Sequence, residues 1–239
     1  MHNLELIQSY ENKWIEFKNK KAIDKAKLRE SIRLFNKINI NNTIVIKPII
    51  VNLYALLGGI PFQEKEIYFL SKIQNRIFNS INDERVYKVK QTNYGLECFV
   101  LKWHDTEKFD EKNIQHVKKY LNELSLPKYK IKFKGIQIHT DGCVIAKFID
   151  INKEFRSLRK DFLLKFNFLP RRQSSWVHVP LGRILYNLDK RVIENLISEC
   201  EDINENHNFE IEINKYSLVH EKRWYMEDKE ILFIKNLNE

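Results

Sequence analysis

The chain has 239 residues, with 41 Lys and Arg against 32 Asp and Glu, which gives a formal net charge of +9. This length suits one large domain or two small ones, and a hydrophobic fraction of 43% excludes a disordered chain. The six glycines form neither G-x-G-x-x-G nor G-x-x-x-x-G-K, and the three cysteines form no C-x-x-C pair, so dinucleotide, P-loop, disulfide-rich and sulfur-rich zinc proteins are excluded.

The first half of the chain predicts a helical hairpin followed by strands and helices. Apolar residues recur at helical spacing over residues 4–20 and 22–38, and Asn41-Asn42-Thr43 ends this pattern. The apolar stretch at 44–62 contains a lysine, a proline and an asparagine, so it predicts buried strands rather than a membrane helix. Further on we expect helices over 63–81 and 111–124, the second capped by Asp110, and strands over 86–91 and 96–103.

The second half predicts the same kinds of element. Asp141-Gly142 is typical of a turn that joins two strands. Asp189 is a candidate N-cap for a late helix. We expect strands over 129–138, 143–150, 175–185, 209–218 and 224–235, and helices over 152–167 and 190–201.

The order of these elements repeats along the chain. Strand, helix, strand and helix follow one another from about residue 50 to 124, and again from 143 to 201. This order indicates a duplicated α+β unit with pseudo-twofold symmetry. Two such units would pack their sheets around a shared cleft, where equivalent strands present equivalent side chains.

A short segment near the end of the second unit is the most specific in the chain. It reads Trp176-Val177-His178-Val179-Pro180-Leu181-Gly182-Arg183-Ile184. A strand histidine followed by Leu-Gly-Arg resembles the second signature of the 2H phosphoesterases, which include bacterial "2′-5′ RNA ligase" proteins and RNA 2′,3′-cyclic phosphodiesterases. The family motif is H-x-T/S-x, and Pro180 replaces its hydroxyl residue here. The resemblance spans roughly residues 50 to 237.

The resemblance implies the fold and the division of the chain. It predicts a two-lobed α+β domain of antiparallel sheets with outer helices over 43–239, preceded by a helical hairpin extension at 1–42. It also implies a first signature in the strand at 96–103, where Glu97 falls at the histidine and Phe99 at the hydroxyl residue. An alternative first histidine is His104, in His104-Asp105-Thr106, where the strand should be ending.

In the family, two histidines act as general base and general acid on a phosphodiester, without a metal or another cofactor. Glu97 and His178 are therefore the candidate catalytic pair, with the carboxylate as base and the imidazolium as acid. Candidate substrate-binding residues are Arg183, Lys102 and Tyr94, although strict strand alternation points Arg183 away from His178. The segment from His220 to Trp224 is interpreted as scaffold.

These observations leave three hypotheses open, so the sequence does not decide whether the protein is an enzyme. The first is an RNA-end or oligonucleotide phosphodiesterase acting on a 2′,3′-cyclic phosphate or a 2′-5′ linkage. The second is an inactive descendant that binds RNA or a nucleotide through its positive charge. The third is an interaction protein in which residues 1–42 dock a protein partner or a second copy. Without an apolar leader, a cytoplasmic protein that does not enter a membrane is expected.

Overall fold

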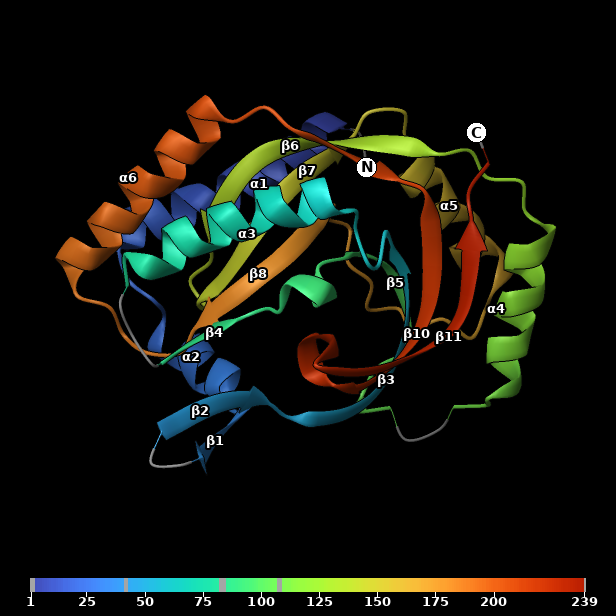
Figure 1. The fold of residues 1–239 in the computed structure, drawn as a ribbon, viewed down its shortest axis with the longest axis horizontal. Helices are drawn as coiled ribbons and strands as arrows, with labels where there is room; N and C mark the ends of the chain where they lie inside the picture. Colours follow the sequence, from blue (N-terminus) through green and yellow to red (C-terminus); the bar gives the residue numbers. More distant parts are fainter. Residues whose placement is uncertain (1–2, 41–42, 82–84, 107–108, 239) are drawn as a thin grey trace.

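The computed structural model describes residues 3–40, 43–81, 85–106 and 109–238, and shows a mixed α+β fold (Figure 1). These residues form two large antiparallel sheets and a short two-stranded ladder. The two large sheets carry the helices on their outer faces, so that their inner faces are turned toward each other. Within the described residues, no helix is long and apolar enough to cross a membrane.

The first sheet has the strand order β11-β10-β3-β5. Its strands are β3 (Ile50–Gly58), β5 (Leu96–Lys102), β10 (Lys215–Arg223) and β11 (Asp228–Asn236). Because β3 lies between β10 and β5, β5 forms an edge of this sheet. The apolar residues of β3 and β5 are buried on both faces, whereas β11 at the other edge exposes Ile231 and Ile234.

The second sheet has the order β4-β8-β7-β6-β9. Its strands are β4 (Val86–Lys88), β6 (Tyr129–Ile138), β7 (Cys143–Asp150), β8 (His178–Ile184) and β9 (Glu210–Ile213). The predicted turn at Asp141-Gly142 joins β6 to β7, and Gly142 has φ +86°, a conformation that glycine adopts without strain. β5 pairs with β3 in the first sheet as β8 pairs with β7 in the second, so the predicted duplication is present.

Two of the helices pack against a sheet other than the one that contains the strand before them. Helix α3, which follows β3, packs against β4 and β8 of the second sheet, whereas α5, which follows β7, also packs against β5 of the first sheet. Helix α4 packs against β11, and α6 packs against β6. Their bounds are α3 Glu64–Asn79, α4 Lys112–Glu123, α5 Glu154–Lys165 and α6 Lys190–Asn206. Helical periodicity in the sequence predicts all four, because each buries one apolar stripe.

The N-terminal region differs from its prediction after the first helix. Helices α1 (Asn3–Lys20) and α2 (Lys25–Ile32) are present, but the second ends at Ile32 rather than continuing to residue 38. Strand β1 (Phe35–Ile40) follows and pairs with β2 (Thr43–Pro48). This pairing between strands overrides the weak helical spacing of the segment. The predicted domain boundary after residue 42 therefore falls between the two strands of one ladder.

Helix α1 is part of the main hydrophobic core. Its apolar stripe, formed by Leu6, Tyr10, Trp14 and Phe17, is buried against the second sheet, where α1 contacts β6 and β7. The apolar face of α1 is thus buried within the chain, and nothing in the described residues supports docking of a partner or second copy by residues 1–42.

Two smaller expectations are also corrected. The predicted strand at 86–91 ends at Lys88, and a 3-10 turn, η1 (Gln91–Asn93), follows it. The N-cap of α4 is Glu111 rather than Asp110, although the Asp110 carboxylate accepts a hydrogen bond of 2.9 Å from the Lys112 amide.

Candidate active site

A cavity of about 200 Å³, called the inner cavity below, lies between the two sheets. Strands β3, β5 and β10 line it from the first sheet, and β7 and β8 line it from the second. The 3-10 turns η1 and η2 (Trp224–Met226) complete the lining. The inner cavity is therefore built where the two halves of the duplicated unit meet.

Glu97 and His178 both line the inner cavity, and both side chains are half-buried. Glu97 is carried by β5 and His178 opens β8, the strands that correspond in the two halves. The structure thus brings together the pair that the sequence places at the two signature positions. Their catalytic roles stay predictions.

Arg183 lines the same cavity, although alternation from His178 predicts the opposite face. The reason is an irregularity in the pairing of β8 with β7, where the register shifts between Val144 and Ile145. One extra residue in β8 at this point reverses the later alternation. The shift returns Arg183 to the cavity side of the strand.

The guanidinium of Arg183 is held in place by three groups. Its Nε donates to the Tyr225 hydroxyl over 3.0 Å, and its Nη1 donates to Ser31 Oγ over 2.6 Å. The Asp141 carboxylate lies 3.4 Å from Nη1. Because Ser31 belongs to α2, the N-terminal hairpin helps to orient a cation of the cavity.

His178 is kept neutral by its surroundings. Burial lowers its pKa to about 3, and the positive charge of Arg159 and the neighbouring His139 act in the same direction. Its Nδ1 is buried and has no hydrogen-bond partner among the described residues. A neutral imidazole of this kind can accept a proton but has none to spare at neutral pH.

Two carboxyl groups of the cavity have raised pKa values, in contrast to the lowered pKa of His178. Burial raises the pKa of Glu97, and the charges of Arg159 and Arg172 offset only part of this effect. Burial also raises the pKa of Glu221 to about 7, and Glu97 adds to the effect, while a hydrogen bond of 2.8 Å from the Met226 amide opposes it. Burial therefore favours the protonated form of both carboxyl groups at the cavity.

Sequence reasoning missed Glu221, which was interpreted as part of the scaffold. It lies on β10, and its place on the inner face depends on the pairing of β10 with β3, which joins residues far apart in the chain. Its neighbours His220, Lys222 and Arg223 are polar or charged, so no local signal marked Glu221 as a buried carboxyl.

The hydroxyl positions of the two signatures are filled by residues that cannot donate to a phosphate. Pro180 lines the inner cavity and has neither a hydroxyl nor a backbone N–H. Phe99 is turned into the core, where its ring centroid lies 4.3 Å from that of Phe162.

Lys102 and Tyr94 lie outside the inner cavity lining, contrary to the expectation. Lys102 is buried, and its ammonium donates to the Asn52 carbonyl over 3.1 Å. Tyr94 is fully buried, and its hydroxyl has no hydrogen-bond partner among the described residues. Neither side chain is placed to contact a ligand between the sheets.

His104 is also outside the inner cavity. It lies in the turn after β5, where its ring meets Trp224 edge to face at 5.1 Å, and it lines a second, larger hollow. This hollow, called the outer groove below, has a volume of about 940 Å³ and shares Arg183 and Trp224 with the inner cavity.

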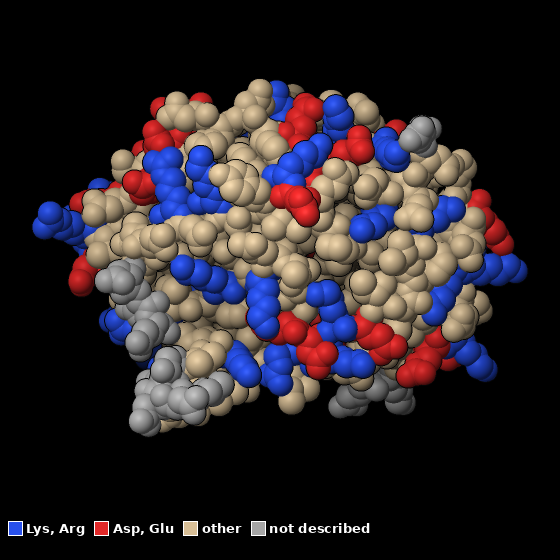
Figure 2. All heavy atoms as spheres, viewed as in Figure 1, with Lys and Arg blue, Asp and Glu red and all other residues tan. Residues whose placement is uncertain are grey.

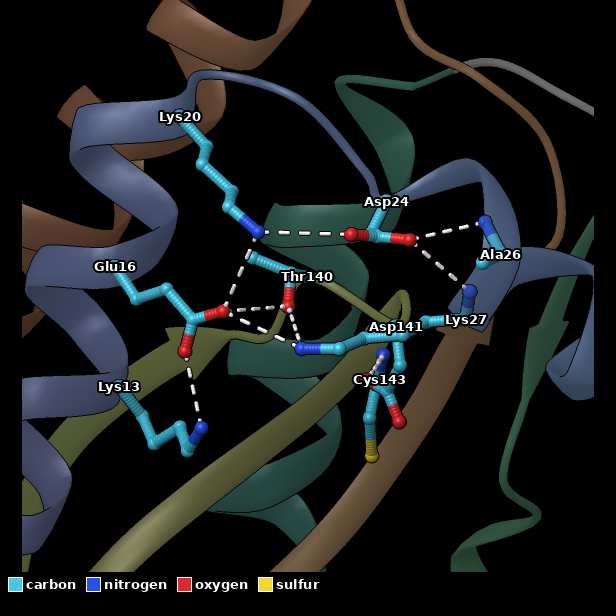
Figure 3. A network of polar contacts seen from close by, with 9 residues as sticks. All are labelled: Lys13, Glu16, Lys20, Asp24, Ala26, Lys27, Thr140, Asp141 and Cys143. Atoms are coloured by element: carbon cyan, nitrogen blue, oxygen red, sulfur yellow. Dashed lines mark hydrogen bonds and ion pairs between the residues drawn. The ribbon is translucent and has the colours of Figure 1, made fainter.

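The outer groove is framed by the N-terminal hairpin and the β6–β7 turn, which a polar network joins (Figure 3). Glu16 of α1 lies 3.0 Å from the Lys13 ammonium and 3.3 Å from the Lys27 ammonium, and it accepts a hydrogen bond from Thr140. The Asp24 amide donates to the Thr140 carbonyl over 2.7 Å. These contacts fix the hairpin to the sheet that carries His178.

The described residues contain no group of three His, Cys, Asp or Glu side chains arranged to hold a metal ion.

Comparison with known proteins places the fold. No family model matches the sequence, and no curated protein is similar to it. The structure is similar to TT0787 of Thermus thermophilus, with 12% identity and a TM-score of 0.55, over 77% of this chain and 97% of that one. It is similar to E. coli LigT solved with ATP, with 10% identity and a TM-score of 0.50, over 79% and 99% of the two chains. A protein described as a phosphoesterase matches with 9% identity and a TM-score of 0.50, over 79% and 99%. The chain therefore has the 2H phosphoesterase-like fold, the fold of LigT.

Proposed function

We propose that the protein is a phosphodiesterase that acts on RNA ends or oligonucleotides at the inner cavity, with Glu97 and His178 as its acid–base pair. The observation that carries the proposal is the meeting of these two side chains, from corresponding strands of the two halves, in one cavity. Two titratable groups whose surroundings push their pKa values apart are suited to opposite roles in proton transfer.

The protonation states assign the roles in the reverse of the order that the sequence suggested. Neutral His178 is the base, which takes the proton of the attacking water or hydroxyl. Glu97, whose pKa is raised by burial, is the acid, which gives its proton to the leaving oxygen. One phosphorus–oxygen bond forms as another breaks, and one proton is taken up as one is released. A protonated Glu97 also brings no negative charge next to the phosphate.

Arg183 is the candidate phosphate ligand. It is the cation among the inner cavity residues, and its hydrogen bonds to Tyr225 and Ser31 hold the guanidinium in one orientation. An arginine can donate two hydrogen bonds to a phosphate. These would replace some of the hydroxyl donors that are missing at Pro180 and Phe99. The fold is compatible with a nucleotide ligand, since LigT was solved with ATP.

The test is cleavage of 2′,3′-cyclic nucleotides and of 2′-5′-linked and 3′-5′-linked oligonucleotides. We expect His178→Ala and Glu97→Gln each to lower the rate by about 10²–10⁴-fold, the usual contribution of an acid or base. Exposed residues of the same types supply matched controls, His116→Ala on α4 and Glu205→Gln on α6, which should retain the wild-type rate. We also expect the rate to fall as the pH rises through the raised pKa of Glu97. Cleavage that survives both cavity substitutions would contradict the proposal.

The second candidate function is nucleotide or RNA binding without cleavage. It is favoured by one observation, the replacement of both hydroxyl positions by Pro180 and Phe99, which removes donors from the site of charge development. Filter binding over a salt series, run beside the cleavage assay, separates the two functions. Salt-sensitive binding with no turnover of any substrate supports the second, and turnover that requires His178 supports the first.

A further inference from the structure

The inner cavity is too small to hold a whole nucleotide ligand. Pockets for such ligands usually have volumes of about 300–1,000 Å³, whereas the inner cavity has about 200 Å³. The outer groove has about 940 Å³ and adjoins it at Arg183 and Trp224, which line both. A substrate with its phosphate at Arg183 therefore extends into the outer groove.

The outer groove has a surplus of positive charge. Five basic side chains line it against three acidic ones, and Asp141 is already paired with Arg183. On the face shown in Figure 2, Lys and Arg are interspersed with Asp and Glu. Within the part of the chain that the structure describes, neither Arg33 nor Arg172 forms an ion pair with a carboxylate. The basic residues of the groove are Lys13, Lys27, Arg33, Arg172 and Arg183.

Aromatic groups lie at the same junction. The Arg172 guanidinium lies 4.5 Å from the centroid of the Trp103 ring, and the Trp224 ring contacts His104 at the entrance shared by the two hollows. Cations that follow a backbone, next to rings on which bases stack, are the usual means of binding single-stranded nucleic acid.

Much of the outer groove is built by the N-terminal hairpin. Helix α1 supplies Lys13, and α2 with the residues after it supplies Lys27, Ser31 and Arg33. The hairpin lies outside the part of the sequence that resembles the 2H phosphoesterases, and 79% of this chain already covers 99% of LigT. Residues 1–42 therefore add to the groove from outside that part of the sequence.

We propose that the outer groove is a binding subsite for the nucleotides next to the reacting phosphate, in which the N-terminal hairpin holds the backbone of a single-stranded oligonucleotide. The inference rests on the proposed function for the position of that phosphate. It predicts that the protein prefers oligonucleotides to mononucleotides of the same end chemistry. Lys13 and Arg33 serve as phosphate contacts, since the surface pair of Lys13 with Glu16 exchanges readily for a phosphate.

The experiment measures equilibrium binding of a mononucleotide and of a series of longer oligonucleotides, separately from cleavage, in wild type and in two double variants. K13Q/R33Q removes two groove charges, and K160Q/R191Q removes one exposed Lys and one exposed Arg outside the groove. We expect affinity to rise with oligonucleotide length, and K13Q/R33Q to lower the preference for the oligonucleotide by about tenfold or more. The salt slope of that variant should fall by roughly 0.7 for each phosphate that it no longer neutralises. Thermal unfolding of each variant shows that it is folded.

The outcomes separate the subsite from the reaction. Length-dependent binding that K13Q/R33Q weakens supports the subsite even if no substrate is cleaved, a result that would contradict only the phosphodiesterase. Binding that does not depend on length, or that K160Q/R191Q weakens equally, overturns the subsite while leaving the inner cavity as proposed. Equal binding of a poly-glutamate peptide of matched charge also overturns it, because the groove would then select charge alone. If neither mononucleotide nor oligonucleotide binds, both proposals fail.

Discussion

The strands β5 and β8 hold corresponding positions in the two halves, but the chain supports them by different means. β8 lies between β4 and β7, and β4 pairs with it over Gly182 to Ile184. β5 is an edge strand, and side chains take the place of the missing neighbour: Arg159 donates to the carbonyls of Glu97 and Cys98, and Gln173 exchanges two hydrogen bonds with Val100. Strand β5 therefore depends on a few individual side chains along its free edge, whereas β8 has a strand on each side over its second half.

The strongest test of this difference is Arg159→Met. Arg159 is buried, and its Nε and Nη2 each lie 2.5 Å from the strand carbonyls that they contact. Methionine leaves both carbonyls without these donors, and a buried unsatisfied group costs about 1–3 kcal/mol, so we expect a loss of about 4 kcal/mol in the free energy of unfolding, measured with urea. Lys160→Met, at the next and exposed position, should change it by less than about 0.5 kcal/mol. Equal stability of the two variants would show that β5 does not need its side-chain edge.

The support of β8 includes one hydroxyl that can be removed without changing the shape of the side chain. The Tyr10 hydroxyl donates to the Val177 carbonyl over 2.6 Å and accepts from the Val177 amide over 2.9 Å, just before His178. Tyr10→Phe should lower the free energy of unfolding by about 2 kcal/mol, less than Arg159→Met, because only one hydroxyl is removed while the strand pairs remain. Tyr68→Phe on α3, where Tyr68 is 70% exposed, is the matched control. A destabilisation as large as that of Arg159→Met would remove the contrast between the two strands.

The smallest expected effect is a pair of opposite pH dependences of the free energy of unfolding, one from a residue of each sheet. Glu221 has a pKa raised from 4.5 to about 7, so its contribution to stability is complete below pH 4.5 and is lost as the pH rises to about 7. His178 has a pKa lowered from 6.5 to about 3, so its contribution is present above pH 6.5 and is lost as the pH falls toward 3. Each effect is on the order of 1 kcal/mol, because the cavity side of each group is open to solvent.

Urea unfolding across this pH range separates the two contributions. Glu221→Gln should remove the decline between pH 4.5 and 7, and His178→Gln should remove the decline below pH 6.5. For each variant, the difference in the free energy of unfolding from wild type is plotted against pH. Slopes of the same sign for the two variants would contradict the assigned directions of the pKa shifts.

The fold was predictable to the extent that its signals are local. The apolar stripes of α3, α4 and α6 and the turn at Asp141-Gly142 are each readable from neighbouring residues, and the order of elements indicated the duplication. The pairing of β1 with β2 was not readable, because it depends on a partner strand rather than on the segment's own spacing.

The site was predictable only where one strand carried the signal. His178 and Glu97, which the resemblance places at signature positions on their own strands, both line the inner cavity, and their roles stay predictions. Arg183 was a candidate substrate-binding residue although strict alternation pointed it away, and a register shift against β7, which leaves no mark in the sequence of β8, returns it to the cavity. Glu221 was missed because its position on the cavity depends on the pairing of β10 with β3, which brings together residues more than 150 positions apart.

The contact between Tyr10 and Val177 also has a consequence for folding. It joins residues separated by 167 positions, and α1 packs on strands that are synthesised long after it. Contacts of such high sequence separation form late, since the entropy of closing a long loop must be overcome first. During synthesis the apolar stripe of α1 therefore stays exposed until β6 and β7 have been made. The surroundings of His178 are complete only when α1 packs against the second sheet.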